Sequence, residues 1–243
     1  MSNEVEVTDS RTPAVDVVEG SMTEYARHTL ADQLPDPVDG LKRVQRRVVW
    51  TLRDVTAARK AATVVGRVLS LYHPHGDQSI ADTLARLTQW FSMPYPLADG
   101  QSGNTGSYAG DPPSAPRYLE VSRSQFLMDV YFRGGKYKSL DYMLSETAEA
   151  MEPLRLVPAV PMGLLMSTFG LAVGFQSQTL PLRLSSVCRI AMRYAEMSNS
   201  VNSEREEMKK HPEWFVPDAF CHNLIRNSRE LMSMARRGEF SGR

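Results

Sequence analysis

The chain has 243 residues, of which 42% are hydrophobic and 23% are charged, a composition typical of a folded globular protein and not of a disordered one. Lysine plus arginine equals aspartate plus glutamate at 28 each, so the net charge alone identifies no acidic partner. The two cysteines, Cys188 and Cys221, stand far apart and outside any CxxC pattern, so they suggest neither a disulfide framework nor a zinc site.

Charge is distributed unevenly along the chain. Residues 1–20 carry five acidic residues against a single arginine, Arg11, and we expect a flexible acidic arm there. From Lys42 to Arg67 there are eight basic residues and one acidic residue, Asp54. Such a positive stretch, balanced by acidic residues elsewhere, is typical of a protein that binds a polyanion. No apolar run reaches the ~18 residues of a membrane span and no signal-peptide core is present, so we expect an intracellular protein without a membrane partner.

Two helices are predicted in the first part of the chain. A short helix over Thr23–Leu34 must end by Pro35, because the LPDP sequence places two prolines within one turn. The second, Leu41–Thr56, is amphipathic, since its apolar residues recur at spacings of three and four. We expect its basic residues on the exposed face, and these are Lys42, Arg43, Arg46, Arg47 and Arg53. A solvated surface would explain them, but like charges on one helix repel and favour a bound anion.

A helix-turn-helix is predicted next. A helix over Ala57–Tyr72 is followed by the turn His73-Pro74-His75-Gly76-Asp77, in which Asp77 is expected to cap another helix that runs to Phe91. Without a third ligand nearby in the sequence, His73 and His75 are not expected to bind a metal ion. They remain candidate hydrogen-bond donors to phosphate.

An irregular, accessible segment is predicted from Asp99 to Glu120, because DGQSGNTGSYAGDPPSAPRYLE is rich in Gly, Ser, Asn, Pro and Asp. It presents Arg117 and Tyr118. A phenol has a pKa near 10, so a nucleophilic tyrosine needs a nearby cation or base, and Arg117 supplies part of that cation. The alternative is that Tyr118 is half-buried at the start of a strand and Arg117 is an ordinary surface charge.

The rest of the chain favours an α+β fold. A helix over Ser122–Phe132 leads to a basic, glycine-containing turn at Arg133–Lys138. After Met151 the apolar runs are broken by Pro and Gly, which indicates buried strands and tight loops. Further helices are expected at Ser185–Asn199 and Cys221–Arg236.

Five segments together resemble the A-type breakage–reunion subunits of type IIA DNA topoisomerases, the family of gyrase A and topoisomerase IV A. In the family's order they are LPDPVDGLKRVQRRVVW, YHPHGDQSIADTLARL, DGQSGNTGS, PRYLE and GLLMSTFGLAVGFQSQTLP. A weaker sixth segment, PDAFCHNLIRNSRELMSMARRGEFSGR, extends the resemblance to the C-terminus.

The resemblance implies roles for individual residues. Tyr118 falls on the nucleophile that forms a 5′-phosphotyrosine with DNA, and Arg117 on the arginine that stabilises the developing charge. Leu180, before Pro181, falls on the apolar residue that wedges between base pairs. Two positions that influence quinolone binding correspond to Gln78 and Asp82. Positions that face DNA correspond to Lys42, Arg46, Arg47, His73 and His75.

The resemblance also implies an organisation. We expect the acidic arm at 1–20, a winged-helix domain with the active-site tyrosine at 21–140, and the beginning of a tower-like domain at 141–243. Implied partners are double-stranded DNA, a TOPRIM/ATPase subunit that holds Mg²⁺ and uses ATP, a second copy in a homodimer, and a further chain that supplies the rest of the tower and the exit gate. No metal site is expected in this chain.

Departures from the family pattern leave a second function open. Gln45 stands where the family has a histidine, and Asp32-Gln33 stand where the family has an arginine before the LPD motif. The glycine loop is one residue longer than usual. These features are most like those of phage-encoded split versions of the subunit. The alternative is therefore a non-catalytic winged-helix DNA-binding protein derived from such a subunit. The retained Arg117–Tyr118 pair favours the enzyme, because DNA binding alone does not require it.

Overall fold

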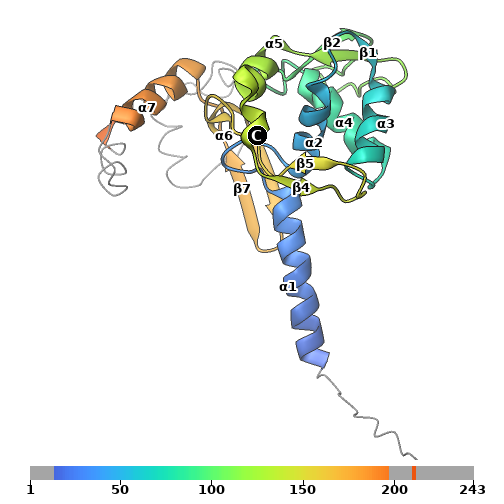
Figure 1. Cartoon of the computed structure of the whole chain (residues 1–243), viewed down its shortest axis with the longest axis vertical. Helices are drawn as coiled ribbons and strands as arrows, with labels where there is room; N and C mark the ends of the chain where they lie inside the picture. Colours follow the sequence, from blue (N-terminus) through green and yellow to red (C-terminus); the bar gives the residue numbers. More distant parts are fainter. Residues whose placement is uncertain (1–13, 197–209, 212–243) are drawn as a thin grey trace, which may run out of the picture.

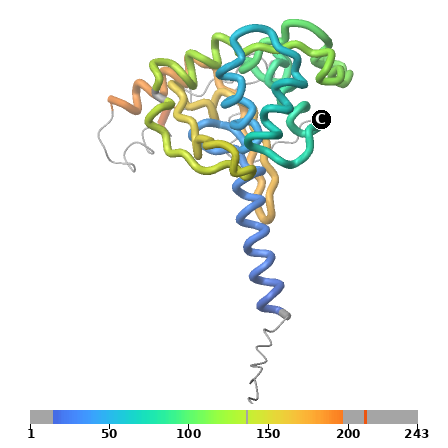
Figure 2. Tube along the Cα trace, turned by 45° about the vertical axis from the view of Figure 1, so that its right-hand side comes forward, coloured from blue at the N-terminus to red at the C-terminus, as the bar shows by residue number. Residues whose placement is uncertain are grey.

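The computed structural model describes residues 14–196 together with Lys210 and His211. Its first element is a long helix, α1 (Ala14–Gln33), which projects away from the body of the molecule (Figure 1, Figure 2). The helix predicted over Thr23–Leu34 is therefore present, but it begins inside the segment predicted to be a flexible arm. It ends directly before Leu34-Pro35, as the prolines of the LPDP sequence require. Residues 1–13 lie outside the described residues.

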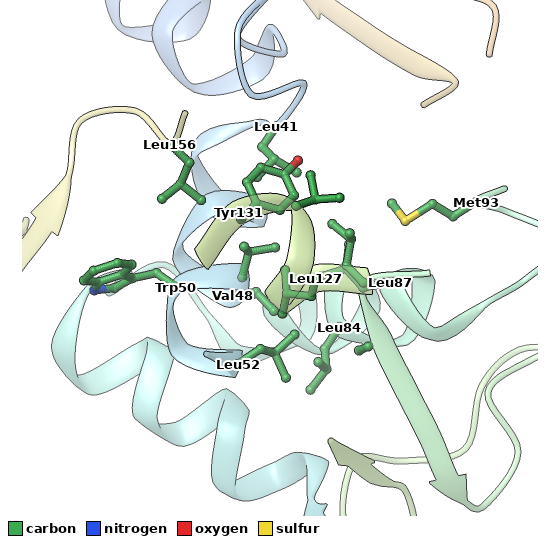
Figure 3. Close-up of a cluster of buried hydrophobic side chains, with 14 of the residues drawn as sticks. Leu41, Val48, Trp50, Leu52, Leu84, Leu87, Met93, Leu127, Tyr131 and Leu156 are labelled. Carbon is green, nitrogen blue, oxygen red and sulfur yellow. The ribbon is translucent and has the colours of Figure 1, made fainter. Parts of the chain in front are cut away.

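Three helices form the centre of the body: α2 (Arg43–Leu52), α3 (Ala61–Leu71) and α4 (Asp77–Thr88). Each buries the apolar stripe that its spacing predicts. At about 1.5–3 kcal/mol for each buried Val or Leu side chain, this shared interior fixes the helices against one another. Figure 3 shows part of this cluster, whose members include Val48, Leu52, Val64, Val68, Ile80, Leu84 and Leu87.

Two helix starts differ from the sequence prediction. The helix predicted from Ala57 begins at Ala61, because Arg59 and Lys60 form strand β1 (Arg59–Lys60). The prediction that Asp77 caps α4 is wrong, because Gly76 occupies the N-cap position and Asp77 lies in the first turn. Gly76 has φ +75°, a left-handed conformation that glycine adopts without strain, and this lets the HPHG turn reverse the chain.

A small antiparallel sheet covers one end of these helices. Its strands are β1, β3 (Glu120–Arg123) and β2 (Ala98–Ser102), in the order β1-β3-β2. Val121 of β3 pairs with Arg59 on one side and Gly100 on the other, and the register shifts between Gly100 and Ser102. The irregular segment predicted from Asp99 thus begins in a strand and becomes irregular only after Ser102.

The helix predicted over Ser122–Phe132 begins later, because Glu120–Arg123 belong to the sheet. Ser124 caps it by accepting a hydrogen bond from the Leu127 N–H (3.0 Å). A short α-helix, α5 (Gln125–Leu127), then continues as a π-helix, η1 (Met128–Phe132). The predicted basic turn is a 3-10 segment, η2 (Arg133–Ser139), in which Gly134 and Gly135 both have φ +69°.

The C-terminal part of the described chain adds two hairpins and two helices. The helix predicted over Ser185–Asn199 is confirmed as α7. The prediction of buried strands is wrong for β6 and β7, because Phe169, Leu171 and Phe175 are exposed. The helix predicted over Cys221–Arg236 lies outside the described residues. The elements are β4 (Tyr142–Leu144), β5 (Met151–Pro153), α6 (Met162–Leu165), β6 (Thr168–Ala172), β7 (Phe175–Thr179) and α7 (Leu184–Glu196).

The helices and small sheets confirm the α+β class. The buried Tyr131 hydroxyl of η1 donates to the Asp39 carbonyl ahead of α2 (2.7 Å), and Figure 3 shows Tyr131 next to Leu41. Burial raises the pKa of the Tyr131 hydroxyl well above its usual value, so it stays a neutral donor. One buried cluster includes residues on both sides of residue 140, and the division at that point stays a prediction. Within the described residues, no helix combines the length and apolar character needed to cross a bilayer.

Candidate active site

Tyr118 lies on an accessible loop immediately before β3. Its side chain is 59% exposed, so the expectation of a displayed tyrosine is confirmed and the half-buried alternative is not. The Arg117 guanidinium carbon lies 4.7 Å from the centre of the Tyr118 ring, in the range of a cation–π contact. The chain thus places a fixed positive charge beside a solvent-facing phenol.

The backbone around Tyr118 is fastened to helix α3. The Ala61 N–H donates to the Leu119 carbonyl (2.9 Å), and the Ala62 N–H donates to the Pro116 carbonyl (3.2 Å). These bonds satisfy N–H groups that a helix start otherwise leaves unpaired. Because Leu119 is buried while Tyr118 is exposed, the tyrosine is held on both sides by a rigid backbone.

Gly103 allows the loop after β2 to pass close to Tyr118. It has φ +89°, and a Cβ atom at this position would lie 2.7 Å from the Tyr118 carbonyl oxygen and 2.9 Å from Leu119 Cδ2. We expect Gly103→Ala to lower the free energy of unfolding by about 1–3 kcal/mol and to displace the tyrosine. Denaturant unfolding measures the first effect. Gly110→Ala is the control, since Gly110 also has positive φ but nothing lies within 4 Å of its added Cβ; equal losses in the two variants would contradict the steric argument.

A groove of about 810 Å³ runs between α1, the start of α2, α4 and the start of β6. Its lining brings together four residues that the sequence predicts as functional: Lys42, His73, His75 and Asp82. Burial, and then repulsion from Arg86, lower the pKa of the Lys42 ammonium. Among the described residues neither Lys42 nor Arg86 forms an ion pair with a carboxylate, so the groove holds cations that an anion would stabilise.

Arg46 and Arg47 do not lie on the exposed face, where the sequence predicts them. Arg46 is buried and forms two hydrogen bonds with Asp39 (2.5 and 3.1 Å). Arg47 is 1% exposed and pairs through two bonds of 2.7 Å with the buried Glu152. That prediction is wrong because a buried guanidinium is stable when several carboxylate oxygens surround it, and both carboxylates come from outside the helix.

Arg47 also organises the HPHG turn. It donates to His73 Nδ1 (2.7 Å) and to Glu146 Oε1 (2.8 Å). His75 Nε2 lies 2.5 Å from Glu146 Oε2, and the two imidazole rings are 4.9 Å apart. Burial, and then the charges of Arg47 and His75, lower the pKa of His73 to about 4. His73 is therefore neutral at pH 7 and accepts from Arg47.

Glu146 remains a carboxylate at neutral pH. Burial raises its pKa, but hydrogen bonds with Arg47 and His75 outweigh that effect and lower it to about 2. For Arg47, burial opposes the charge, while hydrogen bonds to Glu152 and Glu146 raise its pKa. The network therefore joins the guanidinium groups of Arg47 and Arg43 to the carboxylates of Glu146 and Glu152. No local sequence signal identifies Glu146, because it lies 71 residues after His75.

The network predicts acid lability. The folded protein keeps His73 neutral down to about pH 4, whereas the unfolded chain takes up that proton near 6.5, so stability falls as the pH drops through this window. Glu146 adds a further loss below pH 4.5, because only the unfolded carboxylate is protonated there. We expect the thermal midpoint to decline below pH 6.5, and His73→Gln to flatten the decline down to pH 4.5. Parallel curves for the two proteins would remove His73 as the cause.

His73, His75 and Glu146 place possible donor atoms within 4.8 Å of one another. Two imidazole nitrogens do not suit Mg²⁺, which prefers oxygen ligands. The Arg47 guanidinium bonded to two of the three residues also opposes a divalent cation. We therefore interpret this cluster as an ion-pair network.

Gln78 and Asp82 lie together on the exposed side of α4. The Gln78 side-chain amide donates to Asp82 Oδ1 (2.7 Å). Both line a second cavity, of about 270 Å³, whose opposite wall is the loop from Thr105 to Leu119. Asp82 lines this cavity and also the larger groove that contains Lys42 and Arg86, the cationic groove. Helix α4 therefore lies between the cationic groove and the loop from Thr105 to Leu119, the tyrosine loop, which carries Tyr118.

Six predicted residues are not part of the groove lining: Arg46, Arg47, Gln78, Arg117, Tyr118 and Leu180. Leu180 follows β7 and is half-buried, directly before the buried Pro181. Gln45, which stands where the family has a histidine, stabilises the start of α2. Its side-chain carbonyl accepts a hydrogen bond from the Lys42 N–H (2.9 Å) and so fixes the first turn of α2 beside the groove.

The described residues thus include an exposed tyrosine–arginine pair and, apart from it, a groove lined by Lys42, Arg43 and Arg86. Residues 33–234 match the family model that describes the A subunit of DNA gyrase/topoisomerase IV. The chain therefore belongs to the family of the A subunits of DNA gyrase and topoisomerase IV.

Curated relatives agree with this assignment. The DNA gyrase A subunit of Borrelia hermsii is 38% identical over 179 residues, which is 71% of this chain and 22% of that protein. The DNA gyrase A subunit of Borreliella burgdorferi is 33% identical over 219 residues, 87% of this chain and 27% of that protein. The DNA topoisomerase 4 A subunit of Synechocystis sp. is 38% identical over 176 residues, 70% of this chain and 19% of that protein. The chain thus spans only about a fifth to a quarter of the length of these relatives.

Proposed function

We propose that this chain is the DNA-cleaving and religating part of a type IIA DNA topoisomerase, with Tyr118 as the nucleophile. The observation that carries the proposal is the exposure of Tyr118 next to the Arg117 guanidinium, on a backbone fixed to α3 and β3. A tyrosine with a purely structural role would be expected to bury its ring against the sheet.

The proposed reaction is a reversible transesterification. The Tyr118 oxygen forms a bond to a DNA phosphorus while the bond from phosphorus to the 3′-oxygen breaks. The phenol loses its proton and the departing 3′-oxygen gains one, so the step needs no oxidant or reductant. Arg117 stabilises the negative charge that grows on the phosphoryl oxygens. Because the phosphotyrosine keeps the bond energy, resealing runs as the reverse step.

The metal and nucleotide chemistry would belong to a partner subunit. When bound, Mg²⁺ would supply Lewis-acid stabilisation of the phosphoryl group. Among the described residues the only ligand cluster is the His73–His75–Glu146 group, whose nitrogen donors suit Mg²⁺ poorly. A TOPRIM/ATPase subunit would hold the ion and use ATP, and the enzyme would act intracellularly as a homodimer on double-stranded DNA.

The scaffold fits the same proposal. Helices α2, α3 and α4 with sheet β1-β3-β2 would form a winged-helix domain, and the elements from β4 onward would begin a tower-like region. The groove cations Lys42 and Arg86 would contact phosphates, with His73 and His75 beside them. Leu180 would enter the base stack at the end of β7. The Gln45 and Asp32-Gln33 departures favour a phage origin for this chain.

A second function is a non-catalytic winged-helix protein that only binds DNA. It is favoured by the engagement of Arg46 and Arg47 with internal carboxylates, which leaves fewer cations for a transition state than the sequence suggests. The position before the LPD motif, where the family has an arginine, holds Asp32-Gln33.

The experiment that separates the two functions traps the covalent complex. The full chain is incubated with end-labelled duplex DNA, Mg²⁺ and a TOPRIM/ATPase partner, and the reaction is stopped with denaturant. We expect protein attached to a 5′ end and a free 3′-hydroxyl that a polymerase extends. DNA binding with every partner but without any adduct would establish the binding function instead.

A further inference from the structure

One carboxylate, that of Glu146, receives hydrogen bonds from three basic side chains. Its Oε1 atom accepts from Arg47 Nη2 (2.8 Å) and Arg43 Nη1 (3.3 Å), and its Oε2 atom lies 2.5 Å from His75 Nε2. The donors come from α2 and from the turn before α4, whereas Glu146 comes from the loop between β4 and β5. The arrangement matches the way proteins surround an anionic oxygen group of a ligand.

The loop that carries Glu146 is held against the end of α3. The Thr147 hydroxyl donates to the Leu71 carbonyl (2.6 Å), and the Ser145 N–H donates to the Ala150 carbonyl (2.9 Å). Ala148 has φ +58°, a left-handed conformation that costs a residue with a Cβ about 1 kcal/mol. The backbone therefore brings the carboxylate to the cations in a conformation that Ala148 does not favour on its own.

Glu146 differs from the other carboxylate bound to Arg47. Glu152 is buried in β5 and forms two bonds of 2.7 Å with Arg47, so it is a fixed internal partner. The Glu146 side chain is a quarter exposed. If the Glu146 side chain moves away, Arg47 still forms its ion pair with Glu152. Arg43 still forms its ion pair with Asp32, with 3.1 Å between Arg43 Nη1 and Asp32 Oδ1. Each arginine then retains one carboxylate, while His75 becomes available.

Arg43 and His75 line the cationic groove that also contains Lys42. A phosphate group accepts hydrogen bonds from the same guanidinium and imidazole donors as a carboxylate. Resting on the proposed function, we propose that Glu146 occupies the position of a DNA phosphate in the free protein and competes with the DNA backbone for Arg43 and His75. The carboxylate thereby weakens binding and reduces its dependence on salt.

A different role for Glu146 would change the affinity for DNA in the opposite direction. If Glu146 only orients Arg43 and His75 toward DNA, removal of its carboxylate should loosen those side chains and weaken DNA binding. The sign of the change in affinity therefore decides between competition and orientation.

The test compares Glu146→Gln with Glu149→Gln in the full chain. The first substitution keeps the shape of the side chain, and Glu149 is an exposed acid of the same loop that forms no ion pair among the described residues, so its variant removes an equal charge nearby. Affinity for a fluorescent duplex is measured over a salt series. We expect Glu146→Gln to bind about three- to ten-fold tighter than wild type at low salt, with the slope of log K against log salt steeper by about one unit. Glu149→Gln should change both values much less.

Weaker or unchanged binding by Glu146→Gln, or equal gains in the two variants, would overturn the proposal. Circular dichroism shows whether the variant is folded. If it is not, Glu146→Asp takes its place, since it keeps the charge but shortens the side chain; tighter binding than wild type supports competition, and equal or weaker binding overturns it. The measurement needs no cleavage. A wild type that binds DNA but forms no adduct with any TOPRIM/ATPase partner contradicts the proposed enzyme, while the comparison of variants still decides the role of Glu146.

Discussion

Replacing Tyr118 by phenylalanine is expected to abolish the covalent protein–DNA complex while leaving duplex binding nearly unchanged. The substitution removes only the phenolic oxygen, which in the proposed reaction is the atom that bonds to phosphorus. Because the side chain is 59% exposed, we expect the free energy of unfolding to change by less than about 0.5 kcal/mol. Adduct formation is measured on denaturing gels with labelled DNA, Mg²⁺ and a TOPRIM/ATPase partner, and binding by fluorescence anisotropy.

Tyr108 provides the matched control. It lies in the same segment before β3 and is 75% exposed, but no arginine contact to its ring is found among the described residues. Tyr108→Phe should therefore form the adduct at the wild-type level. An adduct that survives in Tyr118→Phe and disappears in Tyr108→Phe would show that the wrong tyrosine had been assigned.

Replacing Arg47 by methionine is expected to cause the largest loss of stability. The methionine side chain would fill part of the space, but the buried Glu152 would lose both of its hydrogen bonds to the guanidinium. Removing one partner of a buried ion pair typically costs about 3–5 kcal/mol, because an uncompensated charge remains inside. Denaturant unfolding of the full chain measures this loss.

Two further variants test the cause. Arg43→Met removes a partly exposed guanidinium from the same helix and should cost much less, since its ion pairs are partly solvated. The double variant Arg47→Met, Glu152→Leu removes both buried charges and should regain much of the stability lost by Arg47→Met alone. If Arg43→Met lowers the free energy of unfolding as much as Arg47→Met does, burial of the Arg47 charge is not the reason for the loss of stability.

The apolar periodicity predicts the central helices well. The spacing of Val48 with Leu52 and of Ile80 with Leu84 follows the helical repeat, and all four side chains are buried. Element boundaries are predicted less well, because Arg59–Lys60 and Glu120–Arg123 carry no strong local signal and become strands by pairing with each other. That pairing joins segments far apart in the chain, which local patterns do not contain.

The candidate site is predicted in part. The exposure of Tyr118 follows from the composition of its loop, and the resemblance directs attention to His73 and His75. The burial of Arg47 does not follow, because its carboxylate partner Glu152 lies 105 residues later. Charge counting treats every arginine as available to a ligand, whereas the fold engages some of them with internal carboxylates. The resulting network, with Glu146 at its edge, needs the tertiary structure to be seen.

The anchoring of the tyrosine loop to α3 has a mechanical consequence. Hydrogen bonds to the Pro116 and Leu119 carbonyls flank Tyr118, and Leu119 is packed into the interior. If Tyr118 carries a severed DNA end, as proposed, tension on that end would pass into the whole helical body before it could bend the loop. In the proposed homodimer, the break would therefore widen by the movement apart of two entire protomers, each carrying one end, and the ends would return in register when the protomers meet again.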